Sequence, residues 1–248
     1  MSVTTLKIII VVAYVFMVAM NGLANAFPFF GRTTGEVSEA FPNLVTPLGF
    51  AFSIWGLIYI LLGVMVIKTV TLSPDAFADS SMRFFLYAFI VSTLLNAGWL
   101  VAWHALRPGI ALAVMLALLS SLIVAYVFAP DERLLKVPFS IYLGWISVAT
   151  LLNITIVLSV FGLEDLVFTY AYVIGVILIG TLAAMTVLSL QGDVPYALVF
   201  VWAYTAIFLR HLSEDNTILY ASTGFLGIFI LIMAVLTVFQ NGYALYGE

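Results

Sequence analysis

Cysteine is absent from this 248-residue chain, and charged side chains make up only 8% of its residues. Without cysteine there is no disulfide, no thiolate metal site and no cysteine nucleophile. So few charges cannot keep the surface of a globular domain in water, and the mean hydropathy of +1.22 is far above that of soluble domains. The composition therefore excludes a soluble domain and predicts an integral membrane protein.

Histidine is also scarce, and no Asp, Glu, Lys or Arg lies at the centre of an apolar run. The two histidines, His104 and His211, fall near the ends of such runs, with no carboxylates spaced to complete a metal site. The missing central charges argue against carboxylate proton relays, ion-coupled transport and a retinal Schiff base. The chain has no basic cluster, which excludes nucleic-acid binding. We expect no enzymatic active site and no obligatory cofactor.

Long apolar runs are what the chain does have. Runs of about 20 residues suit helices that cross a bilayer, whereas the strands of a transmembrane barrel alternate over about 10 residues. We therefore expect an all-α membrane protein, a polytopic bundle of eight transmembrane helices. The first run is interpreted as a spanning helix, although Ala24 and Ala26 imitate a signal-peptide cleavage site. The expected spans are residues 6–29, 47–70, 83–105, 108–129, 137–161, 166–190, 194–212 and 217–240.

The charges between the spans bear on orientation, since eight spans place both termini on one side. Positive residues favour the cytoplasmic side, and they are more numerous on the side of the termini. We expect cytoplasmic termini in a multi-pass protein of the cell membrane. The longest connection, residues 30–46, is a candidate lid. The terminal side carries Lys7, Lys68, Arg83, Arg133 and Lys136, and the other side carries Arg32, Arg107 and Arg210.

Three spans carry aromatic side chains at helical spacing, and two of these stripes include an asparagine. One interpretation is that the tryptophans pack or sit at the membrane interface, while the asparagines bridge helices with bonds of about 0.6 to 2 kcal/mol. The other is a cavity with aromatic walls and a few directional donors, which suits a flat, mostly apolar ligand. The candidate ligand-binding residues are Trp55, Tyr59, Asn96, Trp99, Trp103, Trp145, Ala149 and Asn153.

The segment WISVATLLN, residues 145–153, resembles the helix 5 signature W-x-S-x-A-T-x-L-N of the TspO/translocator-protein family, the tryptophan-rich sensory proteins. The segment LLNAGWLVAWHALRPGIAL, residues 94–112, is similar to that family's helix 3 and the start of its helix 4. The segment TPLGFAFSIWGLIYILLG, residues 46–63, resembles its helix 2. The three motifs occur in the family's order and spacing, so the resemblance covers about residues 1–161.

The resemblance implies a bundle of five transmembrane helices whose long first loop closes a pocket. It also implies polar ligand contacts at Trp55 and Asn96, an aromatic wall at Trp99, and ligand-flanking positions at Trp145 and Ala149. We therefore expect two parts, a TspO-like bundle over residues 1–161 and three additional helices over residues 162–248. The additional helices either cover the surface through which five-helix relatives dimerise, or add a second site, so a monomer and a homodimer both stay open.

The family resemblance implies a membrane receptor or carrier that binds a tetrapyrrole, a sterol or a similar lipophile. The expected partners are thus a lipophilic small molecule and the lipid bilayer, with a porphyrin or a lipid as the bound molecule. A secondary transporter of a small lipophilic or amphipathic substrate is the alternative. A porphyrin-degrading enzyme is the third hypothesis, and it lacks an acid, a base or a metal site in the sequence.

Overall fold

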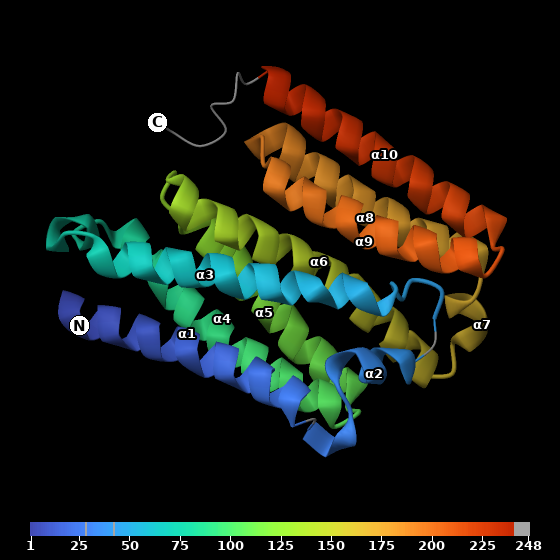
Figure 1. Cartoon of the computed structure of the whole chain (residues 1–248), viewed down its shortest axis with the longest axis horizontal. Coiled ribbons are helices and arrows are strands. Elements are labelled where there is room, and N and C mark those ends of the chain that lie inside the picture. The colour runs from blue at the N-terminus through green and yellow to red at the C-terminus, as the bar shows by residue number, and fades with distance from the viewer. Residues whose placement is uncertain (28, 42, 241–248) are drawn as a thin grey trace. The chain divides into compact units, whose positions relative to one another are not determined.

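The computed structural model describes residues 1–27, 29–41 and 43–240, and these residues form helices joined by short connections (Figure 1). Eight helical segments are long and apolar enough to cross a membrane, and the described residues contain no strand. The all-α fold and the eight spans are confirmed, with boundaries within a few residues of those expected. The segments are α1 (Val3–Ala26), η2 (Gly49–Ser53) with α3 (Ile54–Thr71), α4 (Ser80–His104), α5 (Pro108–Phe128), α6 (Arg133–Val160), α8 (Tyr170–Gln191), α9 (Val194–Ser213) and α10 (Thr217–Gln240).

Short polar sequences set the ends of these helices. Asp79 and Asp193 cap α4 and α9 by accepting hydrogen bonds from backbone N–H groups in the first turn. Pro108 stands in the first turn of α5, where no intrahelical donor is needed. Gly192 ends α8 in the left-handed conformation, with φ of 64°. Local capping residues therefore determine where these apolar helices begin and end.

The described residues form two compact units. Unit 1 consists of Met1–Val37 and Trp55–Leu143, and so contains α1, α3, α4, α5 and the first part of α6. Unit 2 consists of Ser38–Ile54 and, among the described residues, 144–240, and contains η2, the rest of α6, and α8 to α10. The division of the chain into residues 1–161 and 162–248 follows the family resemblance and stays a prediction.

In unit 1, α4 packs against both α5 and α1. The Tyr14 hydroxyl of α1 donates to the Tyr59 carbonyl of α3 at 2.9 Å. A Cβ on Gly63 would lie 2.6 Å from the Tyr14 hydroxyl oxygen, so this glycine leaves room for the tyrosine. At the same end as the N-terminus, Lys7 Nζ donates to the carbonyls of Val70 and Leu72. Close packing at small residues and a few hydrogen bonds thus hold together helices whose other contacts are apolar.

In unit 2, α9 packs against α10 and α8. A Cβ on Gly144 of α6 would lie 3.0 Å from Val199 Cβ and 3.1 Å from the Tyr196 carbonyl oxygen, both on α9. The Tyr204 hydroxyl of α9 lies 3.2 Å from Thr181 Oγ1 of α8. Close backbone approach at a glycine and side-chain bonds between helices are the means by which helices associate in lipid.

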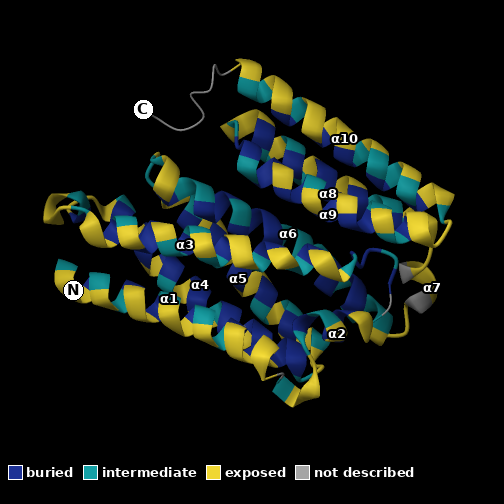
Figure 2. Cartoon of the chain, in the orientation of Figure 1, coloured by how far each residue is buried: buried dark blue, intermediate teal, exposed yellow. Residues whose placement is uncertain are grey.

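The helices present exposed residues on their outer faces (Figure 2), and many of these exposed side chains are large and apolar. On α1, Ile8 and Val12 are about three-fifths exposed, and on α10 the exposed side chains include Phe225, Ile228 and Ile232. In water such surfaces would promote aggregation, whereas lipid chains solvate them without loss. The surface therefore agrees with the composition in placing the eight helices in a membrane.

The first connection contains helical segments, η1 (Phe29–Gly31) and α2 (Thr34–Glu39). Glu36 Oε2 accepts hydrogen bonds from Thr33 N at 2.7 Å and from Thr33 Oγ1 at 2.9 Å, and Glu36 N donates back to Thr33 Oγ1 at 3.3 Å. This is a capping box, read in the sequence as T-x-x-E. The bonds from Thr33, with a smaller contribution from the Arg32 charge, hold the pKa of the Glu36 carboxyl below its usual value.

Candidate functional site

Five aromatic side chains of unit 1 form a continuous series of ring contacts, the aromatic ladder. The Trp55 ring stacks on Tyr59 with centroids 5.5 Å apart and faces Trp99 at 6.3 Å. Trp99 in turn stacks on Trp103 at 5.6 Å, and Tyr142 meets Trp55 edge-on at 5.9 Å. The ladder joins α3, α4 and the first part of α6, so the helical spacing seen in the sequence does align these rings.

The ladder runs from half-buried to fully buried side chains. Trp55 and Tyr59 are half-buried, whereas Trp99 and Trp103 are only 3% and 2% exposed. Trp103 Nε1 donates to the Thr34 carbonyl at 3.2 Å and ties α2 to the end of α4. Trp103 thus belongs to the aromatic ladder and also forms a hydrogen bond that holds the first connection.

Asn96 is fully buried beside the ladder and is oriented by Asn21 of α1. The Asn21 amide donates one hydrogen to the Met17 carbonyl at 2.9 Å and the other to Asn96 Oδ1 at 2.7 Å. Because Asn96 Oδ1 must face this donor, its Nδ2 group points the other way. Asn96 therefore bridges α1 and α4 and keeps a donor for another partner.

Four buried polar atoms of unit 1 have no hydrogen-bond partner among the described residues, and three of them, the polar trio, lie at the ladder: Asn96 Nδ2, the Tyr59 hydroxyl and the Tyr142 hydroxyl. The Tyr142 hydroxyl lies close to Asn96, so two members of the trio are neighbours. An unsatisfied buried polar group costs about 1 to 3 kcal/mol. The trio places N–H and O–H donors beside flat aromatic faces, which is the chemistry of a site for an apolar molecule with a polar edge.

The three candidate residues on the second part of α6 belong to unit 2. Trp145 is 3% exposed and meets Phe52 edge-on, with centroids 6.0 Å apart. Ala149 is half-buried, and its carbonyl accepts a 2.8 Å hydrogen bond from Asn153 Nδ2, one turn further along the same helix. Within the same motif, Ser147 Oγ accepts a hydrogen bond from the Tyr196 hydroxyl of α9 at 3.1 Å.

The structure thus gathers some of the candidate residues and leaves others in the second unit. The members in unit 1 are Trp55, Tyr59, Asn96, Trp99 and Trp103, and those in unit 2 are Trp145, Ala149 and Asn153. Sequence reasoning missed Tyr142, although a signal was present. Tyr142 precedes Trp145 by three residues and Ala149 by seven, so the same helical face includes it.

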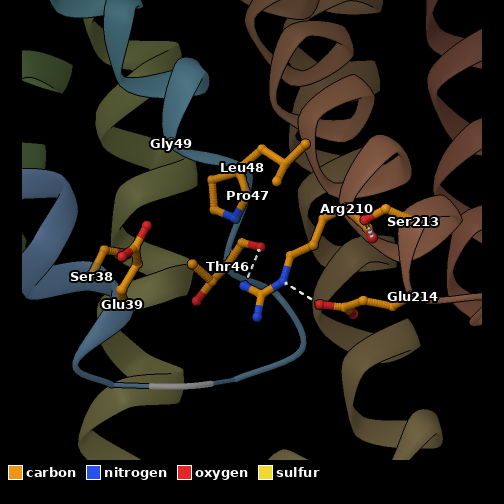
Figure 3. Close-up of a pocket in the computed structure, with 9 residues that line it drawn as sticks. All are labelled: Ser38, Glu39, Thr46, Pro47, Leu48, Gly49, Arg210, Ser213 and Glu214. Atoms are coloured by element: carbon orange, nitrogen blue, oxygen red, sulfur yellow. Dashed lines mark hydrogen bonds and ion pairs between the residues drawn. The ribbon is translucent and has the colours of Figure 1, made fainter.

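A polar pocket of about 280 Å³ lies in unit 2, where the connection before α3 meets the end of α9 (Figure 3). Arg210 crosses it, with Nη1 donating to the Thr46 carbonyl at 3.0 Å and Nε donating to Glu214 at 3.2 Å. Next to it, His211 Nε2 lies 2.8 Å from the Leu44 carbonyl. The lining residues are Ser38, Glu39, Thr46, Pro47, Leu48, Gly49, Arg210, Ser213 and Glu214.

Further bonds from α9 fasten the segment that leads into η2. Trp202 Nε1 donates to the Ala51 carbonyl at 3.0 Å, and its ring meets Phe50 edge-on at 5.3 Å. The backbone N–H of Leu48 donates to the Ala206 carbonyl at 3.4 Å. One of the three additional helices therefore anchors residues 44–51 of the first connection. The sequence alone did not reveal this pocket because its two halves are far apart in the chain.

Within residues 1–27, 29–41 and 43–240, no group of three His, Cys, Asp or Glu side chains is placed to hold a metal ion.

Comparison with protein-family models gives a match to the family described as TSPO-like protein, over residues 7–236. The matched range includes the three spans after residue 161. Comparison with curated proteins and with solved structures gave no match.

Proposed function

Because the chain belongs to the family of TSPO-like proteins, an assignment that rests on a match over residues 7–236, we propose that it is a membrane receptor or carrier for a flat lipophilic molecule. The eight apolar helices and the family together make it an integral, multi-pass membrane protein. The proposed ligand class is a tetrapyrrole, a sterol or a similar planar molecule.

The observation that carries this proposal is the polar trio beside the aromatic ladder. A buried polar atom without a partner is costly in the free protein, and a ligand that bonds to it recovers that cost. Stacked rings favour a planar apolar body, and Asn96 Nδ2 with the two tyrosine hydroxyls favours a polar edge that accepts hydrogen bonds. The proposed contacts in unit 1 are Trp55, Tyr59, Asn96, Trp99 and Trp103, with Tyr142 added.

In unit 2, the motif on α6 carries the other candidate residues, Trp145, Ala149 and Asn153, which we propose from the family resemblance. Ala149 is the smallest of these side chains and is half-buried, so a large residue there would fill space next to α6. We propose that Ala149 leaves room for the planar ligand, as its match to the family motif implies.

The orientation of the chain is part of the same proposal. In unit 1, Lys7 bonds to carbonyls at the end of α3, and Lys68 pairs with Glu132 at 2.7 Å. Arg83 stands at the start of α4 and bonds to the Phe77 and Met1 carbonyls. Several positive charges at this end support cytoplasmic termini in a cell membrane.

The test is a titration of the detergent-purified protein with protoporphyrin and, separately, with the fluorescent sterol dehydroergosterol. Quenching of the five tryptophans reports the porphyrin, and energy transfer from them reports the sterol. Three forms are compared: the natural chain, Ala149→Phe, and the control Ala117→Phe on the exposed face of α5.

Saturable binding that Ala117→Phe keeps and Ala149→Phe loses supports the proposed function. A signal that rises linearly with ligand indicates partitioning into the detergent micelle and contradicts the proposed function. Saturable binding that Ala149→Phe keeps contradicts the role proposed for Ala149.

A further inference from the structure

A second pocket lies in unit 1, at the end of α4 opposite Arg83. Its volume is about 360 Å³, and it is an open hollow lined by residues of η1, by Arg32 and by the turn between α4 and α5. It is distinct from the aromatic ladder and from the pocket of Figure 3. Its lining residues are Phe30, Arg32, His104, Ala105, Leu106 and Arg107.

The charged side chains that line this pocket are both positive. Arg32 and Arg107 reach it from two different segments, and both side chains are exposed. The described lining residues include no carboxylate. The nearest acidic group that interacts with Arg32 is Glu36, whose carboxylate is already held by the backbone and hydroxyl of Thr33. Two guanidinium groups around one hollow favour an oxyanion, because their N–H donors match its oxygens.

His104 gives the pocket a buried polar floor. Its side chain is 1% exposed, and the Phe29 ring packs edge-on against it with centroids 5.8 Å apart. Nδ1 lies 2.8 Å from the Leu100 carbonyl oxygen, which can only accept, so Nδ1 carries a hydrogen. Nε2 is buried and has no partner among the described residues. It therefore donates a hydrogen bond to an anion only when the imidazole is protonated.

The backbone around the pocket is strained. Phe30 and Leu106 both line it, and both adopt positive φ, 57° and 53°, which costs a non-glycine residue about 1 to 3 kcal/mol. Strain of this kind persists where the surrounding structure requires it. Here it keeps the two arginine-bearing segments curled around the same hollow.

We propose that this pocket binds a tetrahedral oxyanion, the phosphate group of a lipid or a free anion of the same chemistry. Arg32 and Arg107 neutralise the charge, and His104 takes up a proton and donates from Nε2. Interfacial arginines are often no more than solvated ends of spans, but such arginines do not account for a buried imidazole nitrogen without a partner in the lining of the same pocket. The site is independent of the lipophile proposed above.

The test measures the midpoint temperature of unfolding of the full chain in a maltoside detergent. One arm titrates sodium sulfate against sodium chloride at matched ionic strength. The other compares phosphatidic acid with diacylglycerol, which lacks the phosphate. The variants are Arg32→Gln with Arg107→Gln, and His104→Asn, whose amide can still reach the Leu100 carbonyl. The control is Arg133→Gln, which removes an exposed arginine elsewhere.

We expect a saturable rise of about 3 °C in the natural chain and in Arg133→Gln, absent from the double arginine variant and reduced in His104→Asn. General stabilisation by sulfate is common to all variants and cancels in the comparison. A response to both ligands assigns the site to free and lipid-borne anions, and a response to phosphatidic acid alone assigns it to the lipid headgroup. No response, or an equal one in the double variant, overturns the proposal.

A pH comparison checks the part given to His104. Sulfate keeps its charge between pH 5.5 and pH 8. The apparent affinity for sulfate should be higher at pH 5.5 in the natural chain and unchanged by pH in His104→Asn. Equal affinities at the two pH values in the natural chain would overturn that part.

Discussion

Asn21 Nδ2 lies 2.7 Å from Asn96 Oδ1, and this bond fixes the orientation of an amide whose own Nδ2 remains without a partner. The Asn96 side chain therefore fits both interpretations of an asparagine inside the membrane, helix bridge and ligand contact. Its oxygen bridges two helices, and its nitrogen is available to a ligand. The two roles can be separated because Asn21 takes part in only one of them.

Replacing either asparagine should lower stability, but only one replacement should strongly weaken ligand binding. Asn21→Ala and Asn96→Ala both remove the bond between α1 and α4, at a cost of about 0.6 to 2 kcal/mol. Asn96→Ala also removes Nδ2, so we expect an additional loss of affinity for the planar ligand of about tenfold. Thermal unfolding in detergent and ligand titration measure the two effects. Equal affinities in the two variants would show that Asn96 acts only as a helix bridge.

The close approach at Gly144 gives a test of packing in unit 2. A Cβ there would lie 3.1 Å from the Tyr196 carbonyl oxygen, which the backbone of α9 holds in place. We expect Gly144→Ala to destabilise the protein by about 1 to 3 kcal/mol. Gly98→Ala is the matched control, because the new Cβ would meet only Val114 at 3.7 Å and alanine favours the helix. A Gly144→Ala protein as stable as Gly98→Ala would contradict the packing described for α6 and α9.

The bonds from α9 to residues 44–51 should slow the exchange of backbone amides there. Trp202→Phe removes the donor to the Ala51 carbonyl while keeping a ring against Phe50, and Arg210→Gln removes the bond to the Thr46 carbonyl. We expect faster hydrogen exchange over residues 44–51 in both variants, above all at the amide of Leu48, which bonds to α9.

Arg133→Gln serves as the control for these exchange measurements, since it alters an exposed arginine of α6 outside this segment. Unchanged exchange in Trp202→Phe and Arg210→Gln would mean that α9 does not anchor the connection.

Acidification should loosen the capping box of α2. The pKa of Glu36 is lowered in the folded protein, chiefly by the bonds from Thr33, so its carboxylate stabilises the fold above the unfolded pKa of about 4.5. That contribution is lost as the pH falls through the lowered folded pKa. We expect amide exchange over residues 33–39, corrected for intrinsic rates, to increase below about pH 4 in the natural chain. Glu36→Gln should show a smaller change, and an identical response in both would refute the role of the carboxylate.

The eight helices were predictable from the sequence because apolar length and charged or capping residues set their limits. The predicted start of α6, residue 137, is a few residues late, because Arg133 and Lys136 were expected to lie outside the helix. The helix in fact begins at Arg133, before the apolar run. The ladder on α3 and α4 was also predictable, because spacing of three or four residues aligns side chains on one helical face.

What sequence reasoning could not predict depends on contacts between distant segments. The helical spacing places Tyr142 on the face of Trp145 and Ala149, but only the fold shows that its hydroxyl is buried without a partner. Arg210 and His211 look like the polar end of a span, and only the fold brings them to Thr46 and Leu44. Tertiary pairing of this kind has no local signature, which is why residues 194–213 showed no site.

The most direct test of the proposed lipophile site is the double variant Tyr59→Phe with Tyr142→Phe. It removes two hydroxyls that lack partners in the free protein and leaves both rings in place. Thermal unfolding in detergent and the affinity for protoporphyrin and dehydroergosterol are measured on the same samples. We expect a free protein at least as stable as the natural chain, with roughly tenfold weaker binding of the ligand that the natural chain accepts. Loss of stability with unchanged affinity would contradict it, because the hydroxyls would then serve the fold and not a ligand.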